Sequence, residues 1–427
     1  MGLPPSNKLL VSFISLVVAT IPLGYVYNSI ALILFILYSF LSVKKENISF
    51  SGALLIPLAF FALMCLSLIW TIDFKSTLKA LSKEAPLLFI PIAFCLNRQV
   101  TQRMITRVVS TFSFAMCIFA LFFLGRAIVR YNATGNTDVF FYHELATMDV
   151  NAIYLSALFS LALFYFLNKK NKGFLGYSML VFLAVFIFLL SSKNIIIIDI
   201  LLIGVYYLFY TGWSKKLKIG AILLLCATVA CLGYNSKIKE RIMEEFSPVE
   251  QAPSAITGVA PHNVTIHEAW TRDKFDSNDY FNGTAFRVYQ IRVFTELLDR
   301  DSILFTGYGL NASGSKIEQI GIEHNLAYVE GSEMVYNKQN FHNQYIESFA
   351  DLGIIGLLLV LAMHFFSVKN AIRNKDFVHI AFAILMIALF LTESFLWRQR
   401  GVVYFTIFYC LFNSFLPGRI EKEKEKE

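Results

Sequence analysis

Residues 341–356 read FHNQYIESFADLGIIG, and this stretch decides how the chain is interpreted. It begins with the polar group His342-Asn343-Gln344 and continues into an apolar segment that extends to about Phe366. Apolar runs of this length predict helices that enter a membrane. The sequence therefore predicts an imidazole at the point where a long, mostly polar loop returns to the membrane.

The overall composition also indicates a membrane protein. Of 427 residues, 56% are hydrophobic and 42 are Phe, which is more apolar surface than a soluble domain can bury. The net charge of +7 is typical of Lys and Arg at a cytoplasmic membrane surface, and no nucleic-acid partner is expected. All six cysteines lie in apolar runs, so neither a disulfide framework nor a metal site is expected.

Apolar runs predict an all-α polytopic membrane protein with about twelve transmembrane helices. The runs lie at about 9–26, 29–43, 51–69, 84–97, 104–125, 146–167, 173–190, 194–211, 217–233, 344–366, 377–395 and 401–416. Nine of them fall in an N-terminal membrane region, residues 1–233, and three in a C-terminal one, residues 344–416.

Basic residues in the connections predict the orientation of the helices. One set of connections carries Lys44-Lys45, Lys169-Lys170 and Lys215-Lys216, whereas in the opposite set the turn at Tyr27-Asn28 has no cation and the turn at 191–193 has one. The first set is therefore expected in the cytoplasm, together with both termini and the charged tail 417–427. The long loop, residues 234–343, then lies outside the membrane and is long enough to form a small domain.

Within this loop, apolar residues recur at helical spacing from Thr284 to Leu298. The pattern predicts an amphipathic helix capped near Asn282 or Thr284. Arg287 lies near its start, where the helix dipole disfavours a cation, and this placement suggests an anionic partner. Arg292 lies about 140° further round the helix and is interpreted as a solvated arginine.

His342 is the candidate general base. The positive end of a helix dipole disfavours imidazolium, and a neutral imidazole accepts a proton from an alcohol near neutral pH. Unpaired N–H groups at the same helix end favour a nearby phosphate. The alternative is that His342 only caps the helix or contacts lipid headgroups.

Three further cations are expected at the outer face. Lys193 follows a very short connection, and either binds a lipid diphosphate or lies at the interface as a structural lysine. Arg398 and Arg400 precede the last apolar run. They suit bidentate phosphate contacts, or else they anchor the membrane interface beside Trp397. Glu393, at the end of an apolar run, is expected to pair with one of these two arginines.

Two segments carry a resemblance to a known family. Ala285-Phe286-Arg287 precedes a glycine turn at 305–309, and Phe341-His342-Asn343 precedes the helix with Gly353 and Gly356. Together with twelve helices and one dominant outer loop, these segments resemble the O-antigen ligase and polymerase superfamily. Gly353 and Gly356 are expected to allow close helix packing.

The resemblance implies an all-helical membrane glycosyltransferase fold, with His342 as catalytic histidine and Arg287 as essential loop arginine. Lys193 matches a family arginine, Arg398 or Arg400 matches a basic position before the last helix, and Asn343 is expected to help bind the diphosphate. The implied donor is an undecaprenyl-diphosphate-linked glycan, and the acceptor is a hydroxyl of lipid A-core or of another lipid-linked glycan. The reaction takes place at the periplasmic face of the bacterial inner membrane, inverts the sugar carbon and uses no cofactor or metal.

The single outer loop favours a ligase over the alternative, a repeat-unit polymerase, because the earlier outer connection at 131–145 is short. A flippase or transporter is a more remote alternative, which predicts charged residues buried along a pathway. Asp199 is the only clear acidic candidate for such a pathway in the sequence.

Overall fold

The protein is described by a computed structural model that covers residues 5–97, 100–147, 150–212, 214, 216–220, 262–276, 278–326 and 336–415. The helices of the N-terminal part are α1 (Pro5–Ala19), α2 (Tyr25–Leu41), α3 (Gly52–Leu66), α4 (Phe74–Glu84), α5 (Pro86–Leu96), α6 (Gln102–Thr134), α7 (Tyr142–Leu145), α8 (Ala152–Asn168), α9 (Gly173–Leu189) and α10 (Lys193–Val205). The later elements are β1 (His262–Val264), α13 (Ile266–Thr271), β2 (Asp279–Phe281), α14 (Gly283–Arg300), α15 (Gly314–Glu323), α16 (Gln344–Asn374), α17 (Phe377–Phe390) and α18 (Gln399–Asn413).

The apolar runs of the sequence form helices wherever the structure describes them in full. Eleven of the twelve expected runs contain a helix, and of the run at 217–233 only residues up to 220 are described. Four described helices are long and apolar enough to cross a membrane, namely the one that starts at Gly52, α6, the one that starts at Lys193, and α16. The chain is therefore mostly helical and suited to a membrane, and the number of twelve spans stays a prediction.

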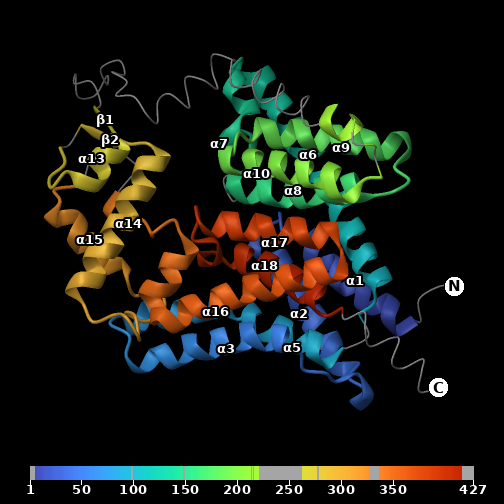
Figure 1. Ribbon diagram of the computed structural model, residues 1–427, viewed down its shortest axis with the longest axis horizontal. Coiled ribbons are helices and arrows are strands. Elements are labelled where there is room, and N and C mark those ends of the chain that lie inside the picture. Colours follow the sequence, from blue (N-terminus) through green and yellow to red (C-terminus); the bar gives the residue numbers. More distant parts are fainter. Residues whose placement is uncertain are drawn as a thin grey trace.

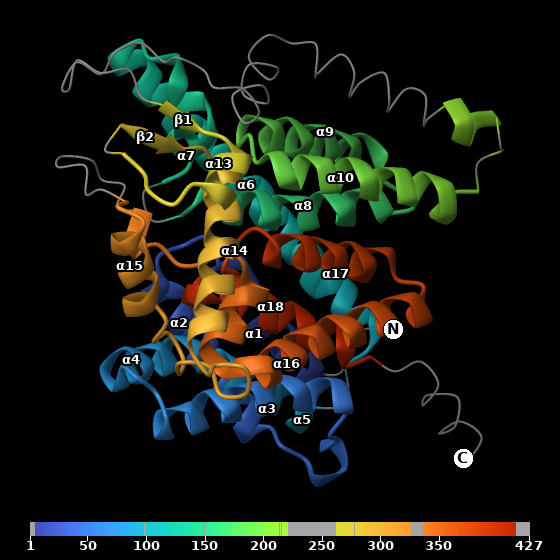
Figure 2. The same cartoon turned by 60° about the vertical axis from the view of Figure 1, so that its left-hand side comes forward.

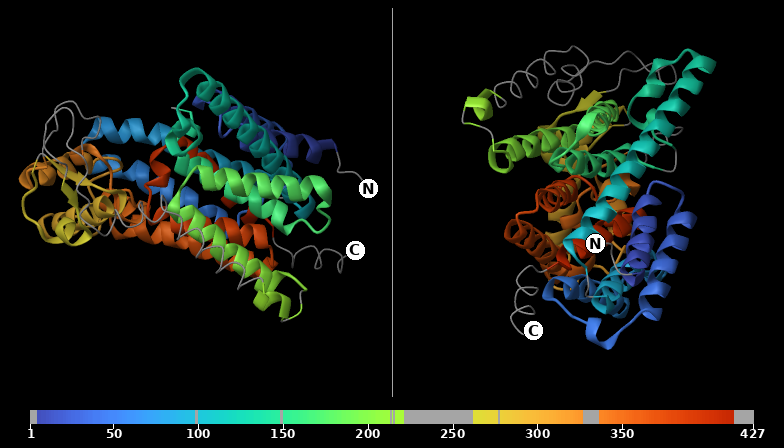
Figure 3. Two further views of the ribbon diagram at one scale, coloured as in Figure 1. Left: turned by 90° about the horizontal axis from the view of Figure 1, so that it is seen from above. Right: turned by 90° about the vertical axis from the view of Figure 1, so that its right-hand side faces the viewer.

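The helices lie in stacked layers, with α8, α9 and α10 above α16, α17 and α18, and with α3 and α5 below (Figure 1). The end-on view shows the same layers, with α1 and α2 along one side (right-hand view of Figure 3). The segment that contains β1, β2 and α13 to α15 projects from one end of this bundle (Figures 1 and 2). The helix α16 runs from that end of the molecule into the bundle.

The projecting segment has a hydrophobic core of its own. Its two strands pair in parallel, with His262 opposite Asp279. The helix α14 begins after Asn282, whose side chain accepts hydrogen bonds from the N–H groups of Thr284 and Ala285, as the sequence predicted. The α14 side chains buried in this core are Ala285, Phe286, Tyr289, Val293 and Leu297. This burial fixes the face of α14 that carries Arg287.

The helix α16 is broken at Gly353, where φ is +68° and ψ is −168°. The loop at residues 304–309 lies in the break: Tyr308 and Gly309 donate backbone hydrogen bonds to the carbonyl groups of Ala350 and Asp351, and Ile354 donates to Leu304. A Cβ atom at position 353 would lie 2.2 Å from the carbonyl oxygen of Phe305. The expectation that Gly353 serves helix packing is therefore wrong, because this glycine admits a loop.

Candidate functional site

His342 lies immediately outside the start of α16. Its φ is +48°, in the left-handed region, and its backbone N–H donates to the side chain of Asn340 over 3.1 Å. The next residue, Asn343, caps α16 by accepting hydrogen bonds from the N–H groups of Tyr345 and Ile346. The ring of Phe286 lies edge-on against the imidazole, with 5.7 Å between ring centroids. The imidazole is thus held between the start of α16 and the start of α14.

The turn after α17, residues 391–396, is fastened to both of these helix starts. From the side of α16, Asn343 donates to the carbonyl oxygen of Leu391 over 3.1 Å, and Gln344 accepts from the N–H of Leu396 over 2.7 Å. From the side of α14, Nε of Arg287 donates to the carbonyl oxygen of Thr392 over 2.8 Å. Residues far apart in the sequence are therefore joined at one turn.

Glu393, in this turn, links the two residues expected to be catalytic. Its Oε1 accepts from a terminal nitrogen of Arg287 over 2.8 Å, and its Oε2 lies 3.6 Å from Nδ1 of His342. The Glu393 side chain is only 10% exposed, compared with 27% for His342 and 29% for Arg287. The structure thus brings Arg287 and His342 together around one carboxylate, with both still open to solvent.

The charge of this carboxylate follows from its neighbours. Burial alone would raise the pKa of Glu393, but the contacts with His342 and Arg287 outweigh burial and hold the pKa below its ordinary value. Glu393 is therefore ionised at neutral pH. A carboxylate beside Nδ1 favours the hydrogen on that nitrogen and leaves Nε2 free to accept a proton.

Glu393 was expected to pair with Arg398 or Arg400, and this expectation is wrong: its partner is Arg287. The sequence does carry a signal for Glu393, a single acidic residue at the end of an apolar run. It could not identify the partner, because Arg287 lies 106 residues earlier in the chain. Only the docking of the turn onto α14 brings the two side chains together.

The two arginines before the last helix lie in different environments. Arg400 is 4% exposed and donates to the backbone carbonyl groups of Ile21 and Leu23 over 2.9 and 2.8 Å, so it fastens the turn between α1 and α2. Arg398 is exposed, and its guanidinium lies 6.0 Å from the centre of the Tyr154 ring. Of the two, Arg398 has the geometry to meet a ligand.

The other expected binding residues have the following places. Asn343 is adjacent to His342, and its amide is used to cap α16 and to hold Leu391. Lys193 is the first residue of α10, and it is half-buried. A diphosphate-binding role for either residue stays a prediction.

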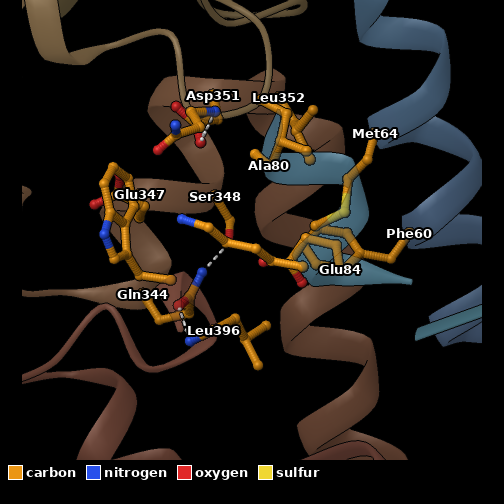
Figure 4. A pocket seen from close by; sticks show the side chains of 14 residues that line it. Phe60, Met64, Ala80, Glu84, Gln344, Glu347, Ser348, Asp351, Leu352 and Leu396 are labelled. Carbon is orange, nitrogen blue, oxygen red and sulfur yellow. Dashed lines mark hydrogen bonds between the residues drawn. The ribbon is translucent and has the colours of Figure 1, made fainter. Parts of the chain in front are cut away.

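A cavity lies behind the start of α16, between this helix, α3 and α4 (Figure 4). Its lining includes the buried carboxyl groups of Glu84, Glu347 and Asp351, and each of them has one oxygen without a hydrogen-bond partner in the described part of the chain. Glu347 connects the cavity to the turn, because its Oε2 accepts from the hydroxyl of Ser394 over 2.8 Å. A buried carboxyl group is costly without a partner, so we expect water or protons in this cavity.

These carboxyl groups bear on the alternative of a transporter. Asp199 is buried in α10 and accepts from the hydroxyl of Ser160 over 2.6 Å. The expectation that it is the only acidic candidate is wrong, because Glu347 and Asp351 are buried in α16 as well. Among the described residues, no three His, Cys, Asp or Glu side chains are grouped to hold a metal ion.

Part of the chain matches a known family. Residues 178–361 match the family described as O-antigen ligase, and this match confirms the resemblance noted in the sequence. The match covers less than half of the chain. It includes Lys193, Arg287 and His342 and ends before Glu393 and Arg398. No curated protein matches the chain.

This match supports a membrane-embedded protein with an O-antigen ligase-like or polymerase-like function. It points to a glycosyltransferase that acts on lipid-linked glycans and takes part in lipopolysaccharide biosynthesis. The apolar helices agree with the membrane location.

Proposed function

We propose that this protein transfers a glycan from an undecaprenyl-diphosphate carrier to a sugar hydroxyl of lipid A-core, at the periplasmic face of the inner membrane. The observation that carries the proposal is the convergence of His342 and Arg287 on Glu393, beside a helix start. A base and a fixed cation next to each other are what a hydroxyl nucleophile and a phosphate leaving group require.

His342 removes the proton of the acceptor hydroxyl with Nε2, while Glu393 holds Nδ1 and stabilises the imidazolium that forms. The acceptor oxygen attacks the anomeric carbon of the donor as the bond from this carbon to the diphosphate oxygen breaks. Direct attack inverts that carbon. The diphosphate leaves with both electrons of the broken bond. Because the donor already carries this leaving group, the step needs no nucleotide, and in this proposal it uses no metal ion.

Arg287 offsets the charge that grows on the leaving diphosphate. Three of its five N–H donors bind protein atoms, at Gly283, Thr392 and Glu393, so at most two remain for phosphate oxygens. Arg398 is the proposed second cation, because it is exposed near the same turn. Lys193, Asn343 and Arg400 were also expected at the diphosphate, and of these Arg400 is the least available.

The second candidate is a polymerase, which joins lipid-linked repeat units, because the family match supports both activities. The connection between α6 and α8 is short, and its described residues form the single-turn helix α7 and a 3₁₀ turn, which favours a ligase. Lipid analysis of a deletion strain separates the two. Loss of all polymer from the core indicates a ligase, whereas a core capped by a single repeat indicates a polymerase.

Complementation of the same strain tests the role of His342. We expect His342→Ala to be produced at the wild-type level and to restore no surface glycan. Wild-type-like glycan in cells that carry this variant would reject the assignment.

A further inference from the structure

The helix α4 has two different faces. It starts after Asp73, which accepts from the N–H of Ser76 over 3.0 Å. Thr77, Ala80 and Glu84 are buried against the rest of the molecule. Both Figure 1 and Figure 2 place this part of the chain at the end of the bundle where α15 projects. The sequence alone did not indicate a helix here, because the segment is too short and too polar to span a membrane.

The outward face of α4 combines exposed apolar and basic side chains. Phe74 and Leu78, four residues apart, are 59% and 54% exposed, and they form one stripe. Lys75 and Lys79 are exposed in the adjacent stripe. Neither lysine forms an ion pair with any described residue. Just before the helix, Ile69 and Ile72 add two more exposed apolar side chains, at 80% and 52%.

An apolar stripe beside a lysine stripe is typical of a helix that lies in the plane of a membrane interface. The apolar side chains enter the region between headgroups and acyl chains, and the lysines extend towards the phosphate groups. We propose that α4 is such an interfacial helix, and that Lys75 and Lys79 bind the phosphates of anionic phospholipids. This inference is independent of glycan transfer.

The helix α4 and the residues before it are connected to the loop that lies in the break of α16. Nε1 of Trp70 donates to the carbonyl oxygen of Thr306 over 2.8 Å. The hydroxyl of Thr77 donates to the carbonyl oxygen of Leu310 over 2.7 Å. The N–H of Ile72 donates to the carbonyl oxygen of Tyr308 over 3.0 Å. A phospholipid bound to α4 would therefore steady the loop that bonds to Ala350 and Asp351 of α16.

The topology predicted from the sequence gives the proposal a second reason. It places residues 70–83 outside the membrane, where lysines are ordinarily scarce, and yet this connection carries Lys75, Lys79 and Lys83. Binding of anionic lipid at the outer leaflet accounts for their presence. A phosphorylated lipid acceptor is the other occupant with the same chemistry, and the experiment distinguishes the two.

The test titrates the full-length protein in detergent with phosphatidylglycerol and counts the bound lipids by native mass spectrometry. We expect the double variant Lys75→Gln/Lys79→Gln to bind roughly 30-fold more weakly at one class of sites, since each basic residue contributes separately to attraction of anionic lipid. Lys75→Arg/Lys79→Arg should retain binding. The control Lys274→Gln/Lys338→Gln removes the same charge from the projecting segment and should bind as the wild type does.

Equal binding by the wild type and Lys75→Gln/Lys79→Gln would overturn the proposal, as would an equal loss in the control. Binding at these lysines of lipid A-core but not of phosphatidylglycerol would also overturn it, and would assign the surface to the acceptor. A loss of fold in the glutamine variant is recognised by its thermal unfolding, and the arginine variant then decides: loss of binding there, with the fold intact, contradicts the proposal. Since lipid binding is the readout, an inactive transferase does not affect the result.

Discussion

Glu393 is the residue on which the geometry of the site depends. It is nearly buried, ionised, and in contact with Arg287 on one side and His342 on the other. The buried carboxylate of Glu393 would be strongly destabilising without a partner. Its contacts with Arg287 and His342 therefore hold both of these side chains in place. We interpret Glu393 as a residue that positions the base, with Arg287 as both its partner and a donor to the substrate.

We predict that Glu393→Gln lowers the rate of glycan transfer roughly 10²-fold, because the amide cannot stabilise an imidazolium. Glu393→Asp keeps the charge and should retain more activity. The measurement is the initial rate with purified protein at several pH values. Wild-type rates from the glutamine variant at every pH would contradict the role given to Glu393.

The contribution of Glu393 to the stability of the folded protein depends on pH in a defined direction. The pKa of Glu393 is lower in the folded protein than its ordinary value of 4.5, so its contribution to stability is present above about pH 4.5 and is lost as the pH falls through the lower folded value. The difference in Tm between the wild type and Glu393→Gln should therefore shrink in acid. A difference that grows below pH 4.5 would show that the carboxylate is not held ionised.

At the scale of elements, the break in α16 positions the site. The loop at 304–309 lies in this break. Glycine is required at 353 by its positive φ, and because a Cβ atom there would lie 2.2 Å from the carbonyl oxygen of Phe305. The part of α16 before the break, which starts next to His342 and Asn343, is thus bonded at Ala350 and Asp351 to this loop.

We predict that Gly353→Ala destabilises the protein by more than about 1–3 kcal/mol, the cost of this backbone conformation alone for a residue other than glycine. The matched control is Gly125→Ala in α6, where an added Cβ meets no atom within 4 Å. Thermal unfolding in detergent measures both variants. An unchanged Tm in Gly353→Ala would show that the helix is not broken as described.

The sequence predicted some of these elements and not others. Helical periodicity predicted α14, because the signal is local, and of the two caps that the sequence offered, Asn282 and Thr284, the structure has Asn282. The break at Gly353 depends on a loop 45 or so residues earlier in the chain, and no local pattern contains that information. The sequence singled out Arg287 and His342. It did not predict that Glu393 joins them, because that contact also links segments far apart in the chain. It also left open the choice between Arg398 and Arg400, which burial distinguishes.

For the molecule as a whole, the proposed reaction requires the projecting segment and the site to lie outside the cytoplasm. The connection after α6 should then be external and the one after α2 internal. In a variant without native cysteines, a cysteine at Ala133 should react in intact cells with a maleimide that does not cross the inner membrane. A cysteine at Glu46 should react only after lysis; both positions are exposed. The reverse pattern would place His342 on the wrong side for the proposed donor.

The most direct test of the central claim is transfer by purified full-length protein from a defined undecaprenyl-diphosphate-linked glycan to purified lipid A-core. We predict transfer by the wild type and by His267→Ala, whose exposed histidine lies in α13. We predict transfer at the background rate by His342→Ala. Transfer by His342→Ala at the rate of the wild type would contradict the account.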